Sequence, residues 1–120
     1  MHILIVEDDK DLAAQLESSL SDQGHEVAVA RDGEEGLMKA RDYVFDAMVV
    51  DRMMPRLDGY QTCALIKNNS EFKSTPVIML SSKDGLFDKA KGRIVGSDQY
   101  LTKPFSKNEL LDAIQAHVSN

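Results

Sequence analysis

The 120-residue sequence has a single cysteine and no long apolar run. Cys63 has no partner for an internal disulfide, and MHILIV at the start is strand-like, without the basic and cleavable segments of a secretion signal. The longest apolar runs, at 3–6, 47–50 and 77–80, are far shorter than the roughly 20 residues needed to cross a bilayer. These absences predict a cytoplasmic protein with no membrane span.

The sequence also lacks clusters of lysine and arginine. Its formal net charge is −6, so the positive surface expected of a nucleic-acid-binding protein is missing, and we expect no direct binding to nucleic acid. No GxG-type fingerprint follows the first apolar run, which gives little support to a dinucleotide or flavin cofactor. No repeat, low-complexity stretch or linker divides the chain, so we expect one domain over 1–120.

Short apolar runs alternate with longer amphipathic stretches along the whole chain. This pattern predicts five units of strand followed by helix. The expected strands are 2–6, 26–30, 46–50, 76–80 and 99–101, and the expected helices are 10–23, 33–42, 58–68, 85–95 and 107–118. Three of the expected strands contain a continuous apolar run, at 3–6, 47–50 and 77–80, instead of alternating, as in a parallel sheet covered by helices on both faces. The prediction is a doubly wound, three-layer α/β domain with its site at the carboxyl ends of the strands.

Acidic residues follow two of the predicted strands. Glu7, Asp8 and Asp9 come directly after the first strand, and Asp51 comes directly after the third. If these strands are neighbours, the acids repel one another unless a cation neutralises them, and carboxylate oxygens suit Mg²⁺. An aspartate beside such a cation can attack phosphorus to form an aspartyl phosphate. Asp51 is therefore the candidate nucleophile.

Two more strands end in residues suited to phosphoryl groups. The fourth ends at Ser81 and Ser82, whose hydroxyls can donate hydrogen bonds, and the fifth is followed by Lys103 and Pro104. The lysine ammonium can pair with a phosphoryl oxygen. Cation, nucleophile, hydroxyl and fixed positive charge are the parts that phosphoryl transfer requires.

Four motifs in this order resemble the response-regulator receiver family over essentially the whole chain. They are the acidic pair at 7–8, DRMMPRLDG at 51–59, the serine at 81, and YLTKPF at 100–105. Each motif is modest alone, but separations of 30 residues from Asp51 to Ser81 and 52 from Asp51 to Lys103 make the combination specific. The resemblance implies a flavodoxin-like (βα)5 fold with strand order 2-1-3-4-5.

The resemblance also implies a role for each acidic residue. Asp51 would take a phosphoryl group from a histidine kinase. Asp8, Asp51 and the backbone carbonyl of Met53 would hold Mg²⁺, with Glu7 completing the acidic pair.

The family's switch residues match as well. Ser81 would be the switch hydroxyl, Lys103 would contact the phosphoryl group, Pro104 matches a cis-linked proline, and Tyr100 matches an aromatic rotamer switch. On phosphorylation Ser81 would move inward and Tyr100 would turn from exposed to buried. This would alter the surface of the fourth helix, fifth strand and fifth helix, where a downstream protein would bind. We expect no output domain after Asn120, and therefore separate partner proteins. We also expect a monomer, or a dimer formed on activation.

The finer resemblance differs between the halves. From PRLDGYQTCALIKNN onward the chain is similar to regulators of type IV pilus twitching motility, whereas MHILIVEDD, DGEEGL and VVDRMMP are closer to receivers that precede winged-helix transcription factors. The chain is thus either a natural relative of both or a composite.

The same residues leave two other functions to consider. A pseudo-receiver, which serves as a constitutive interaction module, would lack part of the acidic set. A phosphohydrolase would carry an acid two residues after its nucleophile, where this chain has Met53, so we expect no enzyme activity. Asp9 and Asp58 are expected to cap helices, and Cys63 to be a buried, inert thiol.

Overall fold

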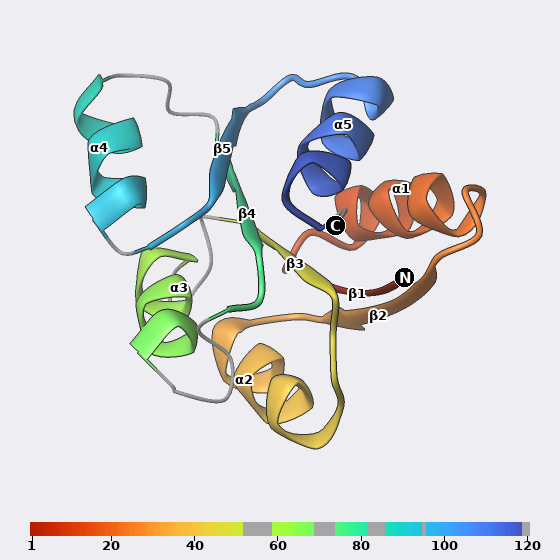
Figure 1. Cartoon of the computed structure of the whole chain (residues 1–120). Helices are drawn as coiled ribbons and strands as arrows, with labels where there is room; N and C mark the ends of the chain where they lie inside the picture. The colour runs from red at the N-terminus through yellow and green to blue at the C-terminus, as the bar shows by residue number, and fades with distance from the viewer. Residues whose placement is uncertain (52–58, 69–73, 82–85, 95, 119–120) are drawn as a thin grey trace.

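The computed structural model describes residues 1–51, 59–68, 74–81, 86–94 and 96–118. These residues form a five-stranded parallel sheet in the order β2-β1-β3-β4-β5 (Figure 1). The strands are β1 (His2–Val6), β2 (Glu26–Ala30), β3 (Ala47–Asp51), β4 (Val77–Ser81) and β5 (Gln99–Thr102). The helices are α1 (Lys10–Ser21), α2 (Gly33–Asp42), α3 (Gly59–Asn68), α4 (Leu86–Ile94) and α5 (Lys107–Val118). The predicted α/β class and strand order are both confirmed.

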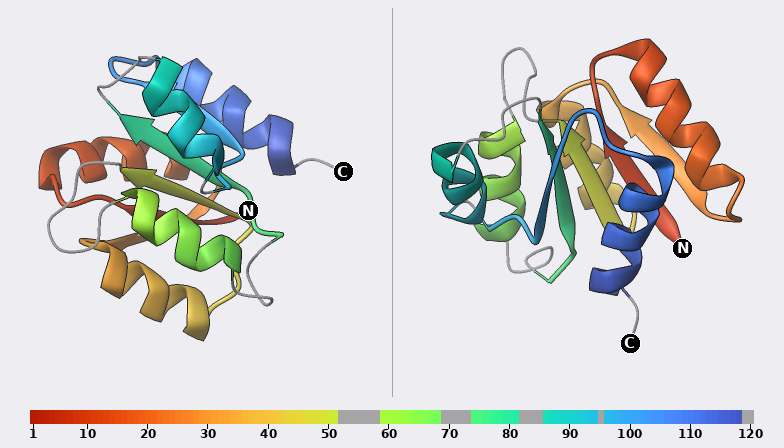
Figure 2. Two further views of the ribbon diagram at one scale, coloured as in Figure 1. Left: turned by 90° about the vertical axis from the view of Figure 1, so that its left-hand side faces the viewer. Right: turned by 90° about the horizontal axis from the view of Figure 1, so that it is seen from above.

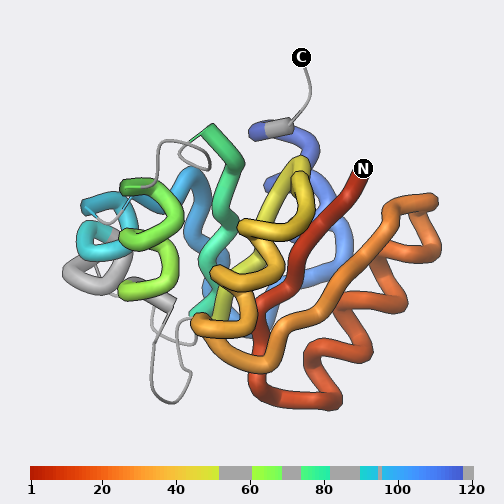
Figure 3. The backbone as a smooth tube through the Cα atoms, turned by 90° about the horizontal axis from the view of Figure 1, so that it is seen from below, coloured from red at the N-terminus to blue at the C-terminus, as the bar shows by residue number. Residues whose placement is uncertain are grey.

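The sheet lies between two layers of helices. α1 and α5 cover one face, and α2, α3 and α4 cover the other (Figure 2). Viewed from below, α3 and α4 lie together on one side of the molecule and α1 lies on the opposite side (Figure 3). Every residue of β3 and β4 is buried, as their continuous apolar character predicts for strands covered on both faces.

Each face of the sheet has its own apolar core. The core under α1 and α5 contains Leu16, Leu20, Leu110 and Ile114, among others, packed on alternate residues of the strands. The core under α2, α3 and α4 includes Ile66 together with the complementary strand residues. Side chains in a strand alternate between faces, so two separate cores follow directly from the parallel sheet.

Helix starts are set by local hydrogen bonds. Asp9 caps α1, where its Oδ1 accepts from the backbone N–H groups of Asp11 at 2.9 Å and Leu12 at 3.2 Å. At α5, Ser106 Oγ accepts from the N–H of Glu109, and Glu109 Oε1 accepts from the N–H of Ser106, which is a capping box. The capping role predicted for Asp9 is confirmed, and the one predicted for Asp58 lies outside the described residues.

Several predicted boundaries differ from the structure by one or two residues. β3 and β4 each begin and end one residue later than predicted, and so include Asp51 and Ser81. β5 ends at Thr102 instead of 101. The strand pairing continues through Asp51 with Leu80 and through Ser81 with Thr102. α1 ends at Ser21 instead of 23. Gly24 has a φ of 86°, which favours glycine, and its N–H donates to the carbonyl of Ser21, so the chain turns there. None of the described helices combines the length and apolarity that crossing a bilayer requires.

Candidate functional site

Three acidic side chains meet at the carboxyl ends of β1 and β3. Glu7 and Asp8 directly follow β1, Asp51 is the last residue of β3, and the two strands are hydrogen-bonded neighbours. One carboxylate oxygen from each of the three residues lies within 4.8 Å of the other two. Glu7 and Asp51 are buried and Asp8 is exposed, so the cluster opens to solvent on the side of Asp8.

Glu7 is the most deeply enclosed member of this cluster, with 2% of its surface exposed. Its Oε2 accepts a hydrogen bond from the backbone N–H of Asp9 at 3.2 Å, whereas none of the described residues donates a hydrogen bond to its Oε1. Burial, together with a hydrogen bond to the neighbouring Asp51 carboxyl and its negative charge, raises the pKa of Glu7 to about 9. Glu7 therefore holds a proton at neutral pH unless a cation takes its place.

Lys103 supplies the positive charge of the site. Its Nζ lies 3.2 Å from Asp51 Oδ2 and 4.0 Å from Glu7 Oε1. Its backbone N–H donates to the carbonyl of Ser81 at 2.7 Å, which ties the end of β5 to the end of β4. The peptide bond between Lys103 and Pro104 is cis, as the resemblance implies.

The two predicted switch side chains occupy different depths. Ser81 is fully buried at the end of β4, one residue beyond Leu80, which pairs with Asp51. Tyr100 is half-buried and packs against the core under α2, α3 and α4, on the same side of the sheet as its strand partner Met79. Its ring is therefore already partly inside the protein. Met53 and Ser82 lie outside the described residues.

The donor set fits a hard divalent cation. The cluster offers carboxylate oxygens from three residues, and magnesium takes such ligands together with water. Glu7 holds a proton, and its buried Oε1 accepts from no donor among the residues that the structure describes. Both features indicate that these residues compensate the negative charge of the cluster only in part. A cation bound here would offset that charge and release the proton.

Gly36 lies in α2 beneath the acidic cluster, and no motif of the sequence includes it as a site residue. A Cβ atom at this position would lie 2.9 Å from Cγ2 of Val6, the residue before Glu7. The missing side chain lets α2 approach the carboxyl end of β1 closely. A glycine inside a predicted helix is the sequence signal that could have pointed to this contact.

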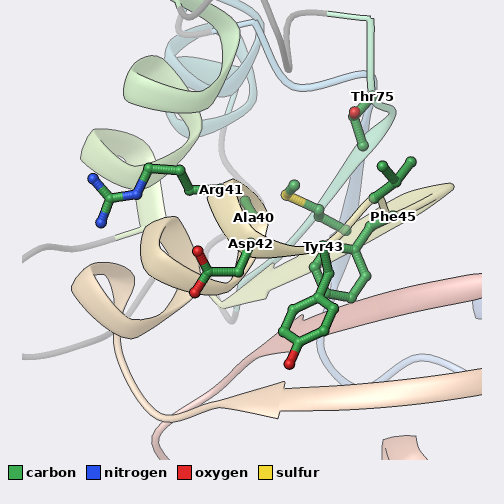
Figure 4. A pocket seen from close by; sticks show the side chains of 8 residues that line it. Ala40, Arg41, Asp42, Tyr43, Phe45 and Thr75 are labelled. Atoms are coloured by element: carbon green, nitrogen blue, oxygen red, sulfur yellow. The ribbon is translucent and has the colours of Figure 1, made fainter.

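A pocket of about 200 Å³ lies at the opposite end of the sheet. The end of α2 and the segment between α2 and β3 line it, including Tyr43 and Phe45, with Thr75 across from them (Figure 4). The ring of His2 packs against Phe45 with 4.4 Å between ring centroids. Because this pocket adjoins the amino ends of β3 and β4, it is separate from the acidic cluster.

Two histidines and the cysteine lie outside the acidic cluster. A ring nitrogen of His2 lies 3.0 Å from the carbonyl oxygen of Val44, and His117 Nε2 lies 3.0 Å from Oε1 of Gln99. Cys63 is fully buried, and burial raises the pKa of its thiol to about 12. This agrees with the expected inert cysteine.

Comparisons with known proteins agree with these features. A family model described as "Response regulator receiver domain" matches residues 3–115. Protein PilG of Pseudomonas aeruginosa is 64% identical over 118 residues, which cover 98% of this chain and 87% of PilG. Response regulator ArlR of Staphylococcus aureus is 39% identical over 114 residues, covering 95% of this chain and 51% of ArlR. The uncharacterised transcriptional regulatory protein YrkP of Bacillus subtilis is 41% identical, and the chain covers 45% of it. The chain therefore spans about half the length of these two relatives.

Known structures show the same fold. The chemotaxis protein CheY4 of Vibrio cholerae is 33% identical, with a TM-score of 0.91 over 96% of each chain. The receiver domain of the sensor histidine kinase PA1611 from Pseudomonas aeruginosa is 28% identical, with a TM-score of 0.91 over 99% of this chain and 98% of that one. That structure has a magnesium ion coordinated in its active site cleft.

Proposed function

The chain belongs to the response regulator receiver family, and on this premise we propose that Asp51 is the residue that accepts the phosphoryl group. The observation that carries the proposal is the meeting of Asp51 with Glu7 and Asp8, with Lys103 Nζ 3.2 Å from Asp51 Oδ2. Burying two acidic side chains beside a third lowers the stability of the folded state, so stability does not explain this arrangement. Such groups gather where a protein performs chemistry.

Magnesium is the cation that we propose for this site. Asp8 and Asp51 would hold it through carboxylate oxygens, with the backbone carbonyl of Met53 as a further ligand, and Glu7 adds charge to the same cluster. When bound, the ion neutralises charge on the acids and on the phosphoryl oxygens. The magnesium in the active site cleft of the PA1611 receiver domain supports this choice.

The proposed phosphoryl donor is a phosphohistidine on a histidine kinase. An oxygen of the Asp51 carboxylate forms a bond to phosphorus while the bond from phosphorus to the histidine nitrogen breaks. The nitrogen keeps the electron pair and the imidazole takes a proton from solvent. Lys103 is close enough to Asp51 to pair with a phosphoryl oxygen on the product, which stabilises the charge that arrives.

The response to phosphorylation follows from new charge at the end of β3. The modification adds roughly −1.5 to −2 charge and three acceptor oxygens, so bonds to Lys103 and to the Ser81 hydroxyl become favourable only in the modified state. β5 joins these groups to Tyr100, which precedes Lys103 by three residues. We propose that the surface of α4, β5 and α5 changes in consequence and is read by a downstream protein.

The test is phosphorylation by a small donor. Acetyl phosphate with Mg²⁺ should add one phosphoryl group to the native chain and none to Asp51→Asn, and removal of Mg²⁺ with a chelator should abolish the modification. Asp42→Asn, at an exposed carboxylate lining the pocket at the other end of the sheet, is the matched control and should be modified like the native chain. Equal modification of Asp51→Asn would refute the assignment, and a native chain that takes no phosphoryl group would support a pseudo-receiver instead.

A further inference from the structure

Gly92 lies in the last turn of α4, where a glycine does not stabilise the helix. Glycine destabilises a helix interior relative to alanine. Gly92 does not have the positive φ that Gly24 and Gly96 have, so its backbone conformation is open to other residues. The residue is buried. A glycine is therefore explained here by the room that a missing side chain leaves for a neighbouring group.

That space is occupied by the ring of Tyr100. A Cβ atom on Gly92 would lie 2.8 Å from Cδ2 and 3.3 Å from Cε2 of Tyr100, and 3.3 Å from Oγ of Ser97. The first distance is too short for two carbon atoms, so the ring would have to move. Figure 1 shows α4 beside β5, the strand that carries the tyrosine. The missing side chain thus forms a notch in α4 that receives the ring.

The same glycine anchors the turn between α4 and β5. Its carbonyl oxygen accepts from the backbone N–H of Ser97 at 3.0 Å and from Ser97 Oγ at 2.9 Å. The end of α4 and the turn that follows it are therefore held together at the point where the Tyr100 ring packs.

A pocket beside Tyr100 offers its ring a second position. This pocket, of about 240 Å³, is lined by Arg93, Ser97, Asp98 and Gln99 as well as by Tyr100. Arg93 and Asp98 are exposed, so this pocket is open to solvent. A ring displaced from the notch can enter it without disturbing the core.

We propose that Gly92 is a positioning residue that sets how often the Tyr100 ring lies packed against α4 instead of outward. A side chain at this position destabilises the packed arrangement only. The consequence for signalling rests on the proposed function: since phosphorylation is expected to favour the buried ring, a substitution at Gly92 weakens the response of the α4, β5 and α5 surface without removing the acceptor site.

The first test is a double-mutant cycle on the unmodified protein. Gly92→Ala in the native chain should leave the Tm unchanged or lower it, because the gain in helix propensity is offset by displacement of the ring. In a Tyr100→Ala background the same substitution should raise the Tm by about 4 °C, since no ring opposes it. An equal change of Tm in both backgrounds overturns the proposal. Gly36→Ala is the matched control: Gly36 lies in α2 and contacts Val6 of β1, so the effect of this substitution should be additive with that of Tyr100→Ala.

The second test observes the ring itself. In protein labelled with fluorotyrosine, the Tyr100 resonance, identified by its loss in Tyr100→Phe, should move toward the solvent-exposed position in Gly92→Ala. Acetyl phosphate should modify Gly92→Ala to the native extent, while the shift of this resonance on adding beryllofluoride should be reduced several-fold. An unmoved Tyr100 resonance in Gly92→Ala overturns the proposal. If the native chain does not respond to beryllofluoride, the proposed function is contradicted but the role of Gly92 is not. The double-mutant cycle and the Tyr100 resonance of the unmodified protein are both measured without phosphorylation.

Discussion

Lys103 Nζ lies 3.2 Å from Oδ2 of Asp51, although the two residues are 52 positions apart in the chain. The contact joins the ends of β5 and β3 across the end of β4. It places the positive charge of the site directly beside the proposed acceptor, with most of the lysine side chain shielded from solvent.

Replacing this lysine should weaken phosphoryl acceptance. Lys103→Met removes a charge-assisted bond worth about 1.5–3 kcal/mol, so the rate of modification by acetyl phosphate should fall by roughly tenfold or more. Lys107→Met, at an exposed lysine nearby in α5, is the control and should react at the native rate. Similar rates for both variants would show that Lys103 plays no part in the transfer.

Glu7 should make stability fall with rising pH when divalent ions are absent. The folded state raises its pKa from 4.5 to about 9, so the stabilisation from the bound proton is complete below pH 4.5 and is lost as the pH rises toward and through 9. Between pH 5 and pH 8 the native chain should lose roughly 4 kcal/mol of unfolding free energy relative to Glu7→Gln, measured by urea unfolding with a chelator present. Glu17→Gln, at an exposed position of α1, should keep the native pH dependence. Parallel profiles for the native chain and Glu7→Gln would contradict the buried, protonated carboxyl.

Magnesium should stabilise the native chain by mass action. An ion that binds only the folded state raises the unfolding free energy by about 2.7 kcal/mol at 100 times its Kd. Because the ion competes with the proton on Glu7, the Mg²⁺-induced rise in Tm should be larger at pH 8 than at pH 6. Asp8→Asn should reduce this rise strongly, whereas Asp11→Asn, an exposed acid in the first turn of α1, should preserve it. A rise in Tm that survives Asp8→Asn would place the ion elsewhere.

The ion pair between Lys67 and Asp98, at the amino end of β4, should contribute measurably to the free energy of unfolding. Lys67 Nζ lies 2.7 Å from Asp98 Oδ2, which also accepts from the N–H of Val77 at 2.8 Å. Asp98→Ala leaves the ammonium and the buried N–H without this acceptor and should cost about 2–3 kcal/mol by urea unfolding. Asp112→Ala on the exposed side of α5 should change stability by less than about 0.5 kcal/mol. Equal losses of stability in Asp98→Ala and Asp112→Ala would mean that the ion pair contributes no more than a single exposed charge.

The sequence predicts the fold well because its signals are local. Apolar strands, amphipathic helices and caps such as Asp9 each occupy a short stretch of chain, so periodicity is enough to find them. The meeting of Glu7 with Asp51 also follows from sequence, since a parallel sheet brings the carboxyl ends of neighbouring strands to one edge. Both predictions need only the order of the elements.

The features that sequence reasoning missed depend on contacts between distant elements. Lys67 and Asp98 are 31 residues apart and neither belongs to a motif, so nothing local indicates their pairing. The notch at Gly92 exists only because α4 packs against the ring of Tyr100. The raised pKa of Glu7 likewise reflects how completely the fold excludes water, which composition alone does not reveal.

The most direct test of the central claim is to locate the phosphoryl group. Treatment of the acetyl phosphate-modified chain with borohydride reduces an aspartyl phosphate to homoserine, which peptide mass spectrometry assigns to a single position. The account predicts homoserine at residue 51, formed only when Mg²⁺ is present during the phosphorylation. Homoserine at Asp8 or at another acid, with residue 51 recovered as aspartate, would contradict it.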